Sequence, residues 1–259
     1  MKKSKIAVLV AMVVVLAFSL AACGGSDKSS SDKTVYKVGT EPTFPPFDTT
    51  DEYQNIVGLD MDLIKAIGED QGFDVEFENL SFDGLIPALK AGNIDIVAAG
   101  MNKDDEDRQK EVDFSDSYYE SKLFVAVTED NTTIKSVEDL TPDMKVVAQT
   151  GTTGASKVQE LKDAGKIKEA VILDGLDTCM MKLINGDVSA VINDKPVTEA
   201  YMKKQPDKIK MVGEALNAEN YGFAVQKGNA ELVEKINNGL KNIKENGTYD
   251  KLVDEWFNK

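Results

Sequence analysis

The chain has 259 residues, with 30 Lys and Arg against 45 Asp and Glu, a formal net charge of −15, and no His. This acidic balance argues against nucleic acid as a partner, because binding phosphates requires a basic face. The lack of His excludes Ser–His and Cys–His catalytic pairs and His-ligated metal sites. With 42% hydrophobic and 29% charged residues, the composition is that of a globular protein long enough to form two lobes.

The N-terminal segment has the pattern of a secretory signal. Three Lys within the first five residues precede an apolar run over residues 6–22, which is short for a membrane span. The run ends in Leu-Ala-Ala-Cys-Gly, which resembles the lipobox of bacterial lipoproteins, although a plain signal anchor with a chance Cys is the alternative. The resemblance implies a signal peptide over residues 1–22, acylation of Cys23 with chains such as palmitate, and a lipidated flexible tether over residues 23–34.

Strand and helix patterns alternate from residue 35 onward. Apolar spacing predicts strands over residues 35–39, 75–78 and 94–98, with helices over residues 59–71 and 83–91 between them. This β-α-β-α-β order predicts a largely parallel sheet with helices on its faces. Within the second helix we expect a kink at Pro87, and we expect Gly92 to cap its end.

A second run repeats this order. Strands are predicted over residues 146–149, 171–173 and 188–192, with helices over residues 155–164 and 178–185. The closing segments of the two runs, residues 88–97 and 182–191, are similar in sequence, which favours two similar α/β lobes. A lipid-bound Cys23 would leave Cys179 without a disulfide partner, and its apolar helix position predicts a buried, unreactive thiol.

The last part of the chain is too small to form a domain. It is predicted to contain a strand over residues 221–225 and helices over residues 230–245 and 248–256. We expect it to return to the first lobe, so that the chain crosses between the lobes twice and forms a hinge beside a ligand cleft. The expected lobes are residues 35–120 with 221–259, and residues 121–220.

Candidate ligand contacts follow the predicted strands. In open α/β sheets, ligands bind beyond the carboxyl ends of the strands. The segments there begin at Thr40, Ala99, Thr150 and Asn193, and they carry aromatic and acidic side chains, hydroxyls and exposed amides. The only Arg of the chain, Arg108, follows an acidic run, and by itself it is compatible with a solvated loop charge as well as with a ligand contact.

An ordered set of motifs resembles the polar amino-acid-binding proteins of ABC importers, the bacterial extracellular solute-binding proteins of family 3. The resemblance covers about residues 35–256. It implies a two-lobed, type II periplasmic-binding-protein-like α/β fold with two hinge crossings, which closes on a free amino acid in the cleft between its lobes. The motifs are Val-Gly-Thr-Glu-Pro-Thr-Phe-Pro-Pro-Phe at 38–47, Gly-Leu-Asp-Met-Asp-Leu at 58–63, Phe-Asp-Gly-Leu-Ile-Pro-Ala-Leu at 82–89, Val-Asp-Phe-Ser at 112–115 after Arg108, Tyr-Tyr at 118–119, and Gly-Thr-Tyr at 247–249 with Trp256.

The resemblance also implies a ligand site. Arg108 would hold the α-carboxylate of the ligand with its planar fork of donors, and Asp194 would hold the α-ammonium. Because these two residues belong to opposite lobes, a zwitterion between them would favour closure. The α-carboxylate would also meet the backbone amides of Ala99 and Gly100 and the side chains of Asn102 and Thr153.

The pocket for the ligand side chain is implied in the same way. Phe44 and Phe82 match positions that sandwich the side chain, although Phe44 is also a candidate for the core. Glu41 matches a position facing a polar or cationic group, and Gln149 a position where specificity varies. Arg, Lys or His is therefore the favoured ligand, with glutamine and cystine as alternatives.

The loop from Asn102 to Arg108 departs from the family pattern. The family usually has Thr/Ser-x-Thr-x-Glu-Arg here, and this chain has one residue more. Asn102 replaces a hydroxyl residue and Asp107 replaces Glu.

Two further function classes are considered. Some relatives of this fold are dehydratases of small acids or cell-wall lyases, but an enzyme needs a general acid or base. The cleft candidates are Glu41 and Asp194 only, so we expect no enzymatic activity. A ligand-sensing domain of a receptor would need a fused transmembrane or signalling segment, and we expect none beyond the signal. We expect a monomeric, lipid-anchored receptor on the outer face of the cell membrane, without metal or cofactor, that delivers an amino acid to the permease and ATPase of an ABC importer.

Overall fold

The computed structural model describes residues 33–258. The predicted signal peptide, Cys23 and the tether up to residue 32 lie outside the described residues. Among the residues described, no helix combines the length and apolar character needed to cross a membrane.

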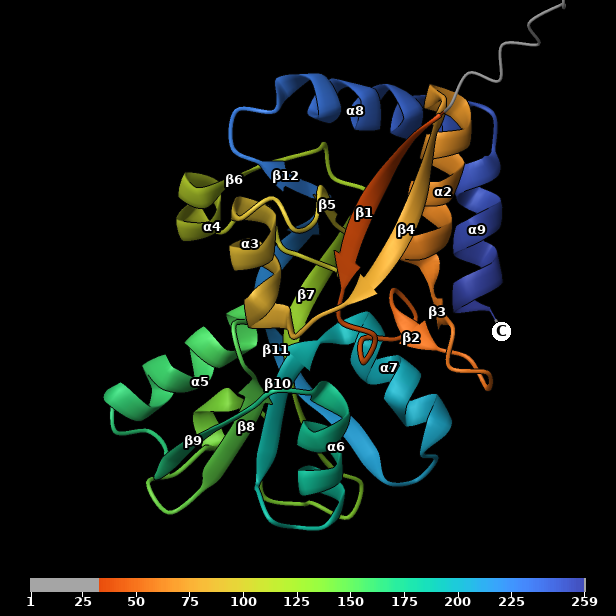
Figure 1. Ribbon diagram of the computed structural model, residues 1–259. Helices are drawn as coiled ribbons and strands as arrows, with labels where there is room; N and C mark the ends of the chain where they lie inside the picture. The colour runs from red at the N-terminus through yellow and green to blue at the C-terminus, as the bar shows by residue number, and fades with distance from the viewer. Residues whose placement is uncertain (1–32, 259) are drawn as a thin grey trace, which may run out of the picture. The chain divides into compact units, whose positions relative to one another are not determined.

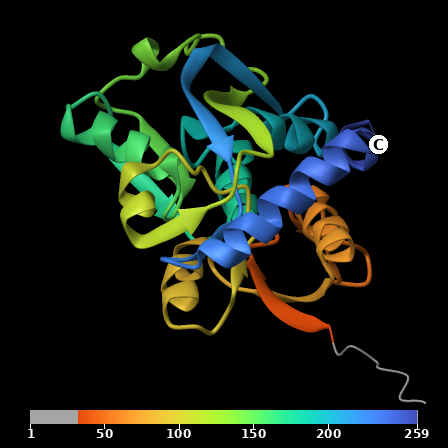
Figure 2. The ribbon, with the colours of Figure 1, turned by 90° about the horizontal axis from the view of Figure 1, so that it is seen from above.

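The first lobe is built on a five-stranded sheet in the order β4-β1-β5-β12-β6, with helices on both faces (Figure 1). Its strands are β1 (Thr34–Thr40), β4 (Phe73–Asn79), β5 (Ile96–Val97), β6 (Val112–Phe114) and β12 (Ala224–Gln226), and a small hairpin pairs β2 (Thr49–Thr50) with β3 (Ile56–Val57). Its helices are α2 (Leu59–Gln71), α3 (Phe82–Lys90), α4 (Glu106–Glu111), α8 (Ala230–Glu245) and α9 (Thr248–Phe257). Seen from above, α8 runs beside α2 (Figure 2).

The second lobe contains the other five-stranded sheet, in the order β11-β7-β10-β8-β9. Its strands are β7 (Tyr119–Thr128), β8 (Lys145–Gln149), β9 (Glu169–Leu173), β10 (Ala190–Asp194) and β11 (Ile209–Tyr221). Its helices are α5 (Thr153–Asp163), α6 (Leu176–Ile184) and α7 (Lys195–Lys204), with a short 3-10 turn η1 (Val137–Asp139).

Both sheets are mixed, whereas the sequence pattern predicted largely parallel ones. In the first lobe β4, β1 and β5 are parallel, and β12 is antiparallel to β5 and β6. In the second, β10, β8 and β9 are parallel, and β7 is antiparallel to β10 and β11. Helical crossovers produce the parallel part of each sheet, and β7 and β12, the strands that begin after the two crossings, run the other way.

Local signals placed most helices well. Helix α2 ends where predicted, because Gly72 adopts the left-handed conformation, with φ of 78°, that a side chain disfavours. Helix α3 continues through Pro87 to Lys90. Its C-cap is Ala91 rather than Gly92, which follows in the left-handed region.

The chain crosses between the lobes twice. The first crossing joins β6 to β7, and the second joins β11 to β12. The continuous strand predicted over residues 221–225 is therefore wrong, because Tyr221 ends a strand of one sheet and Ala224 begins a strand of the other. The crossings are paired, since the amide of Tyr118 donates to the carbonyl of Tyr221 at 3.0 Å.

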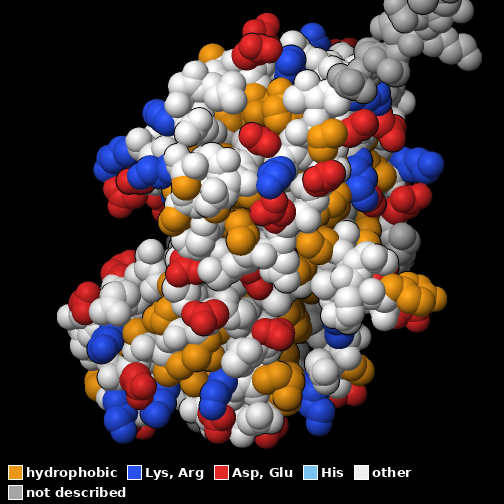
Figure 3. Space-filling view, viewed as in Figure 1, with side chains coloured by type: hydrophobic (Ala, Val, Ile, Leu, Met, Phe, Trp, Pro, Cys, Tyr) orange, Lys and Arg blue, Asp and Glu red, His pale blue; other side chains and the backbone are white. Residues whose placement is uncertain are grey.

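The core of each lobe is apolar, and the surface carries both charges. Cys179 is fully buried, as predicted, and burial raises the pKa of its thiol to about 12. On the face shown in Figure 3, acidic and basic side chains of the described residues are interspersed, with no large basic patch. That face therefore offers nothing suited to a nucleic-acid backbone.

Candidate functional site

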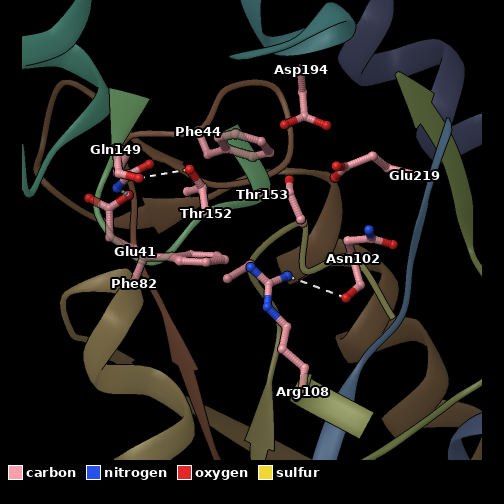
Figure 4. A pocket seen from close by; sticks show the side chains of 12 residues that line it. Glu41, Phe44, Phe82, Asn102, Arg108, Gln149, Thr152, Thr153, Asp194 and Glu219 are labelled. Atoms are coloured by element: carbon pink, nitrogen blue, oxygen red, sulfur yellow. Dashed lines mark hydrogen bonds between the residues drawn. The ribbon is translucent and has the colours of Figure 1, made fainter. Parts of the chain in front are cut away.

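A pocket lies where the carboxyl ends of the parallel strands of the two lobes face each other, and about 330 Å³ inside it is free of protein atoms (Figure 4). All ten residues that the sequence comparison implied as ligand contacts line it, together with two others. The lining residues are Glu41, Phe44, Phe82, Ala99, Gly100, Asn102, Arg108, Gln149, Thr152, Thr153, Asp194 and Glu219.

Arg108 is a buried cation at the centre of the pocket, not a solvated loop charge. Asp105 caps α4 by accepting from the amide of Arg108, at 3.0 Å, which fixes where the helix begins. The Arg108 guanidinium donates to the carbonyl of Asn102 at 3.3 Å and, across the lobes, to that of Gly151 at 2.9 Å. It also lies 5.3 Å from the ring centre of Phe82. These contacts leave donors of the five-donor fork for an anion.

Gly100 and Asn102 mainly shape this end of the pocket. The amide of Gly100 donates to a carboxylate oxygen of Asp60 at 2.8 Å, so the expected free amide donor at this position is already used. Gly100 has φ of 54°, and a Cβ there would lie 2.6 Å from the ring of Phe44. The side-chain oxygen of Asn102 accepts from the amides of Asp104 and Asn220, which ties the lengthened loop to β11.

Two acids form the opposite wall. Asp194 ends β10, and its Oδ1 accepts from the Ser121 hydroxyl at 2.9 Å and from the Tyr221 hydroxyl. Burial, and next the nearby charge of Glu219, raise the pKa of Asp194 to about 7. Burial likewise raises the pKa of Glu219, which is 2% exposed and accepts from Asn217 at 3.2 Å. In Figure 4 both carboxylates lie on the same side of the pocket as Thr153.

Glu219 and Thr152 are the lining residues that the sequence did not indicate. Glu219 comes from β11, whose apolar residues follow no regular alternation, so that apolar periodicity does not reveal the strand. Thr152 was accessible to sequence reasoning, because a hydroxyl residue before a helix is a typical N-cap, and its side chain accepts from the amide of Ala155. Thr153 begins α5 beside it.

The remaining wall contains Glu41, Gln149 and two aromatic rings. The Gln149 amide donates to Glu41 Oε2 and to the carbonyl of Asp174, both at 2.9 Å, so the first of these bonds joins the lobes. Burial raises the pKa of Glu41. Phe44 both lines the pocket and packs in the core, where the centre of its ring lies 6.0 Å from that of Phe47.

The pocket therefore has one cation and three carboxylates. Arg108 can hold a carboxylate, and the acids Asp194 and Glu219 lie across from it. Glu41 is set apart beside Gln149, near the ring of Phe82 (Figure 4). Such an arrangement suits a zwitterion with a second polar or positive group.

Comparison with known proteins gives consistent matches over almost the whole described chain. A sequence model of the bacterial extracellular solute-binding proteins, family 3, matches residues 36–259. The "Probable histidine-binding protein" of Neisseria gonorrhoeae is 34% identical over 252 residues, which is 94% of this chain and 92% of the relative. The ABC transporter arginine-binding protein 1 of Escherichia coli K12 is 34% identical over 224 residues, 85% of this chain and 89% of the relative. An L-cystine-binding protein of Bacillus subtilis is 33% identical over 273 residues, 99% and 98% of the two chains.

Solved structures agree. An ancestral arginine-binding protein bound to arginine superposes with a TM-score of 0.82 at 44% identity, covering 87% of this chain and 99% of that one. The neighbours also include an ancestral arginine-binding protein bound to glutamine, with a TM-score of 0.80 at 45% identity. Another, at a TM-score of 0.79 and 38% identity, is an ancestral amino-acid-binding protein described as a precursor of cyclohexadienyl dehydratase.

Proposed function

Because the chain belongs to the bacterial extracellular solute-binding proteins of family 3, we propose that it binds a free polar L-amino acid between its lobes and delivers it to an ABC importer. The ligand α-carboxylate meets Arg108, and its α-ammonium meets Asp194 and Glu219. The ligand side chain extends between Phe44 and Phe82 towards Glu41.

A single observation favours a cationic ligand, namely the excess of buried carboxylates. The pocket holds three acids against Arg108. A zwitterion offers one cation and one anion, so it leaves this excess unchanged, whereas arginine, lysine or histidinium adds a positive charge that reduces it. Buried charges without partners are costly, so the ligand with the extra cation binds best. The names of an arginine-binding and a histidine-binding relative support this preference.

Glutamine and cystine are the alternative ligands. A solved relative is described as bound to glutamine, and one curated relative is named for cystine. Calorimetry with arginine, lysine, histidine, glutamine and cystine on the purified protein separates these choices. At about 100 times its dissociation constant, a true ligand adds about 2.7 kcal/mol to the free energy of unfolding.

The matched variant for the cationic proposal is Glu41→Gln, which keeps the size of the side chain and removes its charge. Arginine affinity should fall by about 10- to 1,000-fold, because a buried cation then lacks its counter-ion. Glutamine affinity should be spared. A wild-type preference for neutral amino acids, or an equal loss for both ligands in the variant, would show that Glu41 does not select a cation.

The anchoring and delivery steps are parts of the same proposal. Acylation at Cys23 would hold residues 35–259 on the outer face of the membrane through a tether over residues 23–34, as a monomer beside its permease. Fatty-acid labelling of wild type and Cys23→Ser in cells tests the anchor. Uptake of labelled arginine by cells lacking and regaining this chain tests delivery.

Catalysis is the second candidate, and the dehydratase precursor among the structural neighbours is the observation that favours it. We propose binding without turnover, because Asp194 shares the wall with Glu219 and both are assigned to the ammonium. Product analysis after long incubation of the protein with each bound amino acid, and with small organic acids, distinguishes the two functions. Any turnover would overturn the assignment of these carboxylates.

A further inference from the structure

We propose that Thr43 is a positioning residue, which joins the lobes and holds Glu41 in place for the ligand side chain. Thr43 is not among the residues that line the pocket. It lies in the loop after β1, two residues beyond Glu41, and its side chain is half-buried. The inference deepens the proposed function, because it concerns how the Glu41 end of the site selects and retains its ligand.

The hydroxyl of Thr43 makes a two-way link. It donates to Glu41 Oε2 at 2.8 Å, within the first lobe. It accepts from the backbone amide of Leu176 in the second lobe, at 3.1 Å. A hydroxyl has one proton and two lone pairs, so it can serve both partners at once.

Leu176 is the first residue of α6, and the N-cap residue of this helix makes no side-chain hydrogen bond to it. The N-cap position is Gly175, which has no side chain to accept from the free amides of the first turn. Thr43 supplies that acceptor from the other lobe. The amide of Leu176 therefore has this acceptor only when the lobes are in contact.

A second contact fixes the backbone of the same residue. The hydroxyl of Tyr201, from α7, donates to the carbonyl of Thr43 at 2.9 Å. Thr43 is thus held by two helices of the second lobe, through its side chain and through its main chain. The two contacts can be removed separately.

As a consequence, the two oxygens of the Glu41 carboxylate have different roles. Oε2 accepts from Thr43 and, at 2.9 Å, from the Gln149 amide, one donor from each lobe. Oε1 is the other oxygen of this carboxylate, and we assign it to the ligand. A positive group at Oε1 keeps the carboxylate ionised, and an ionised carboxylate is a stronger acceptor than the neutral acid, so the Gln149 bond at Oε2 that joins the lobes is strengthened. Recognition of a cation and retention of the closed arrangement are thereby coupled.

The test compares four variants by calorimetry with arginine. Thr43→Val removes the hydroxyl and keeps the shape, and we expect arginine affinity to fall about 10- to 100-fold, the range for a hydrogen bond to a charged group. Thr43→Ser keeps the hydroxyl and should stay within about threefold of wild type. Tyr201→Phe removes only the main-chain contact and should cost less than about tenfold. Thr43→Ala repeats the loss of the hydroxyl if the valine variant does not fold.

Amide exchange at Leu176, measured by NMR in arginine, provides a second readout. It should be faster in Thr43→Val and Thr43→Ala than in wild type and Thr43→Ser. Equal arginine affinity in the valine and serine variants would overturn the inference. If wild-type protein binds no arginine, the proposed preference for a cation fails, and amide exchange at Leu176 without ligand then tests the role of Thr43. Equal exchange rates in the valine and serine variants would overturn that role. Faster exchange in the valine variant alone would support it.

Discussion

Acidification should weaken ligand binding, and Glu219 should be one reason. Asp194 must be ionised to hold the α-ammonium, but burial and the charge of Glu219 raise its pKa to about 7. Below that pH the unliganded protein carries a proton that binding has to displace. If the ionised fraction of Asp194 sets the apparent affinity, arginine should bind about 25-fold more weakly at pH 5.5 than at pH 7.5.

The variant that tests this reasoning is Glu219→Gln. It removes a like charge beside Asp194, so the pKa of Asp194 falls, although burial still raises it. The loss of affinity on acidification should become smaller than in wild type. Burial also raises the pKa of Glu41, so Glu41 contributes to the pH dependence of affinity as well. The variant leaves Glu41 in place, so the difference in pH dependence between the two proteins reports on Asp194 and Glu219.

Calorimetry with arginine at pH 5.5, 6.5 and 7.5 is the assay. Arginine is suitable because its side chain keeps its charge, whereas histidine titrates near pH 6.5. Glu214→Gln is the matched control, because Glu214 lies on the same strand but is exposed. Equal affinity at all three pH values in wild type, or an unchanged slope in Glu219→Gln, would refute the reasoning.

Four further outcomes are expected. Arg108→Ala should lower arginine affinity by at least about 30-fold, because the ligand carboxylate loses a buried partner; calorimetry showing less than tenfold would mean that another group holds the carboxylate. Asp60→Asn should flatten the pH dependence of stability. Burial raises the pKa of Asp60 to about 7, so the stability that Asp60 contributes is full below about pH 4 and is lost as pH rises through 7. Urea unfolding at pH 4.5 and 7.5 measures this, and a variant that kept the wild-type difference between the two pH values would contradict it. Gly100→Ala should destabilise the fold by about 1–3 kcal/mol through strain and contact with Phe44, and a thermal melt like that of wild type would exclude it. Cys23→Ser should abolish acylation, so a membrane-bound variant labelled with fatty acid would refute the lipobox interpretation.

The sequence predicts this fold best where a single element carries its own signal. Helices α2 and α8 have the predicted bounds, since apolar spacing and a stop signal at the end coincide in each. Strand β11 is different, because its apolar residues do not alternate regularly and most of its residues are at least part-exposed, so pairing with β7 rather than periodicity holds it. The direction of the strands at the crossings likewise depends on contacts between distant segments.

The site residues show the same difference between local signals and long-range contacts. Arg108, in α4, and Asp194, at the end of β10, are indicated by motifs, and both line the pocket. Glu219 was not predicted as a site residue because β11, the strand that carries it, was not predicted either. The engagement of the Gly100 amide by Asp60 involves residues 40 positions apart, and no local pattern indicates such a contact.

The position of β12 has a consequence for the order in which the chain can fold. This strand lies between β5 and β6 in the first sheet, yet it begins only at Ala224. Until that segment is synthesised, β5 and β6 lack their common neighbour, and two strand edges stay open to wrong partners. The second sheet, in contrast, is drawn from one uninterrupted stretch, Tyr119 to Tyr221, and needs nothing from either end of the chain. The lobe that begins first is therefore completed last, and loss of the C-terminal segment would remove the middle of a sheet rather than an appendage.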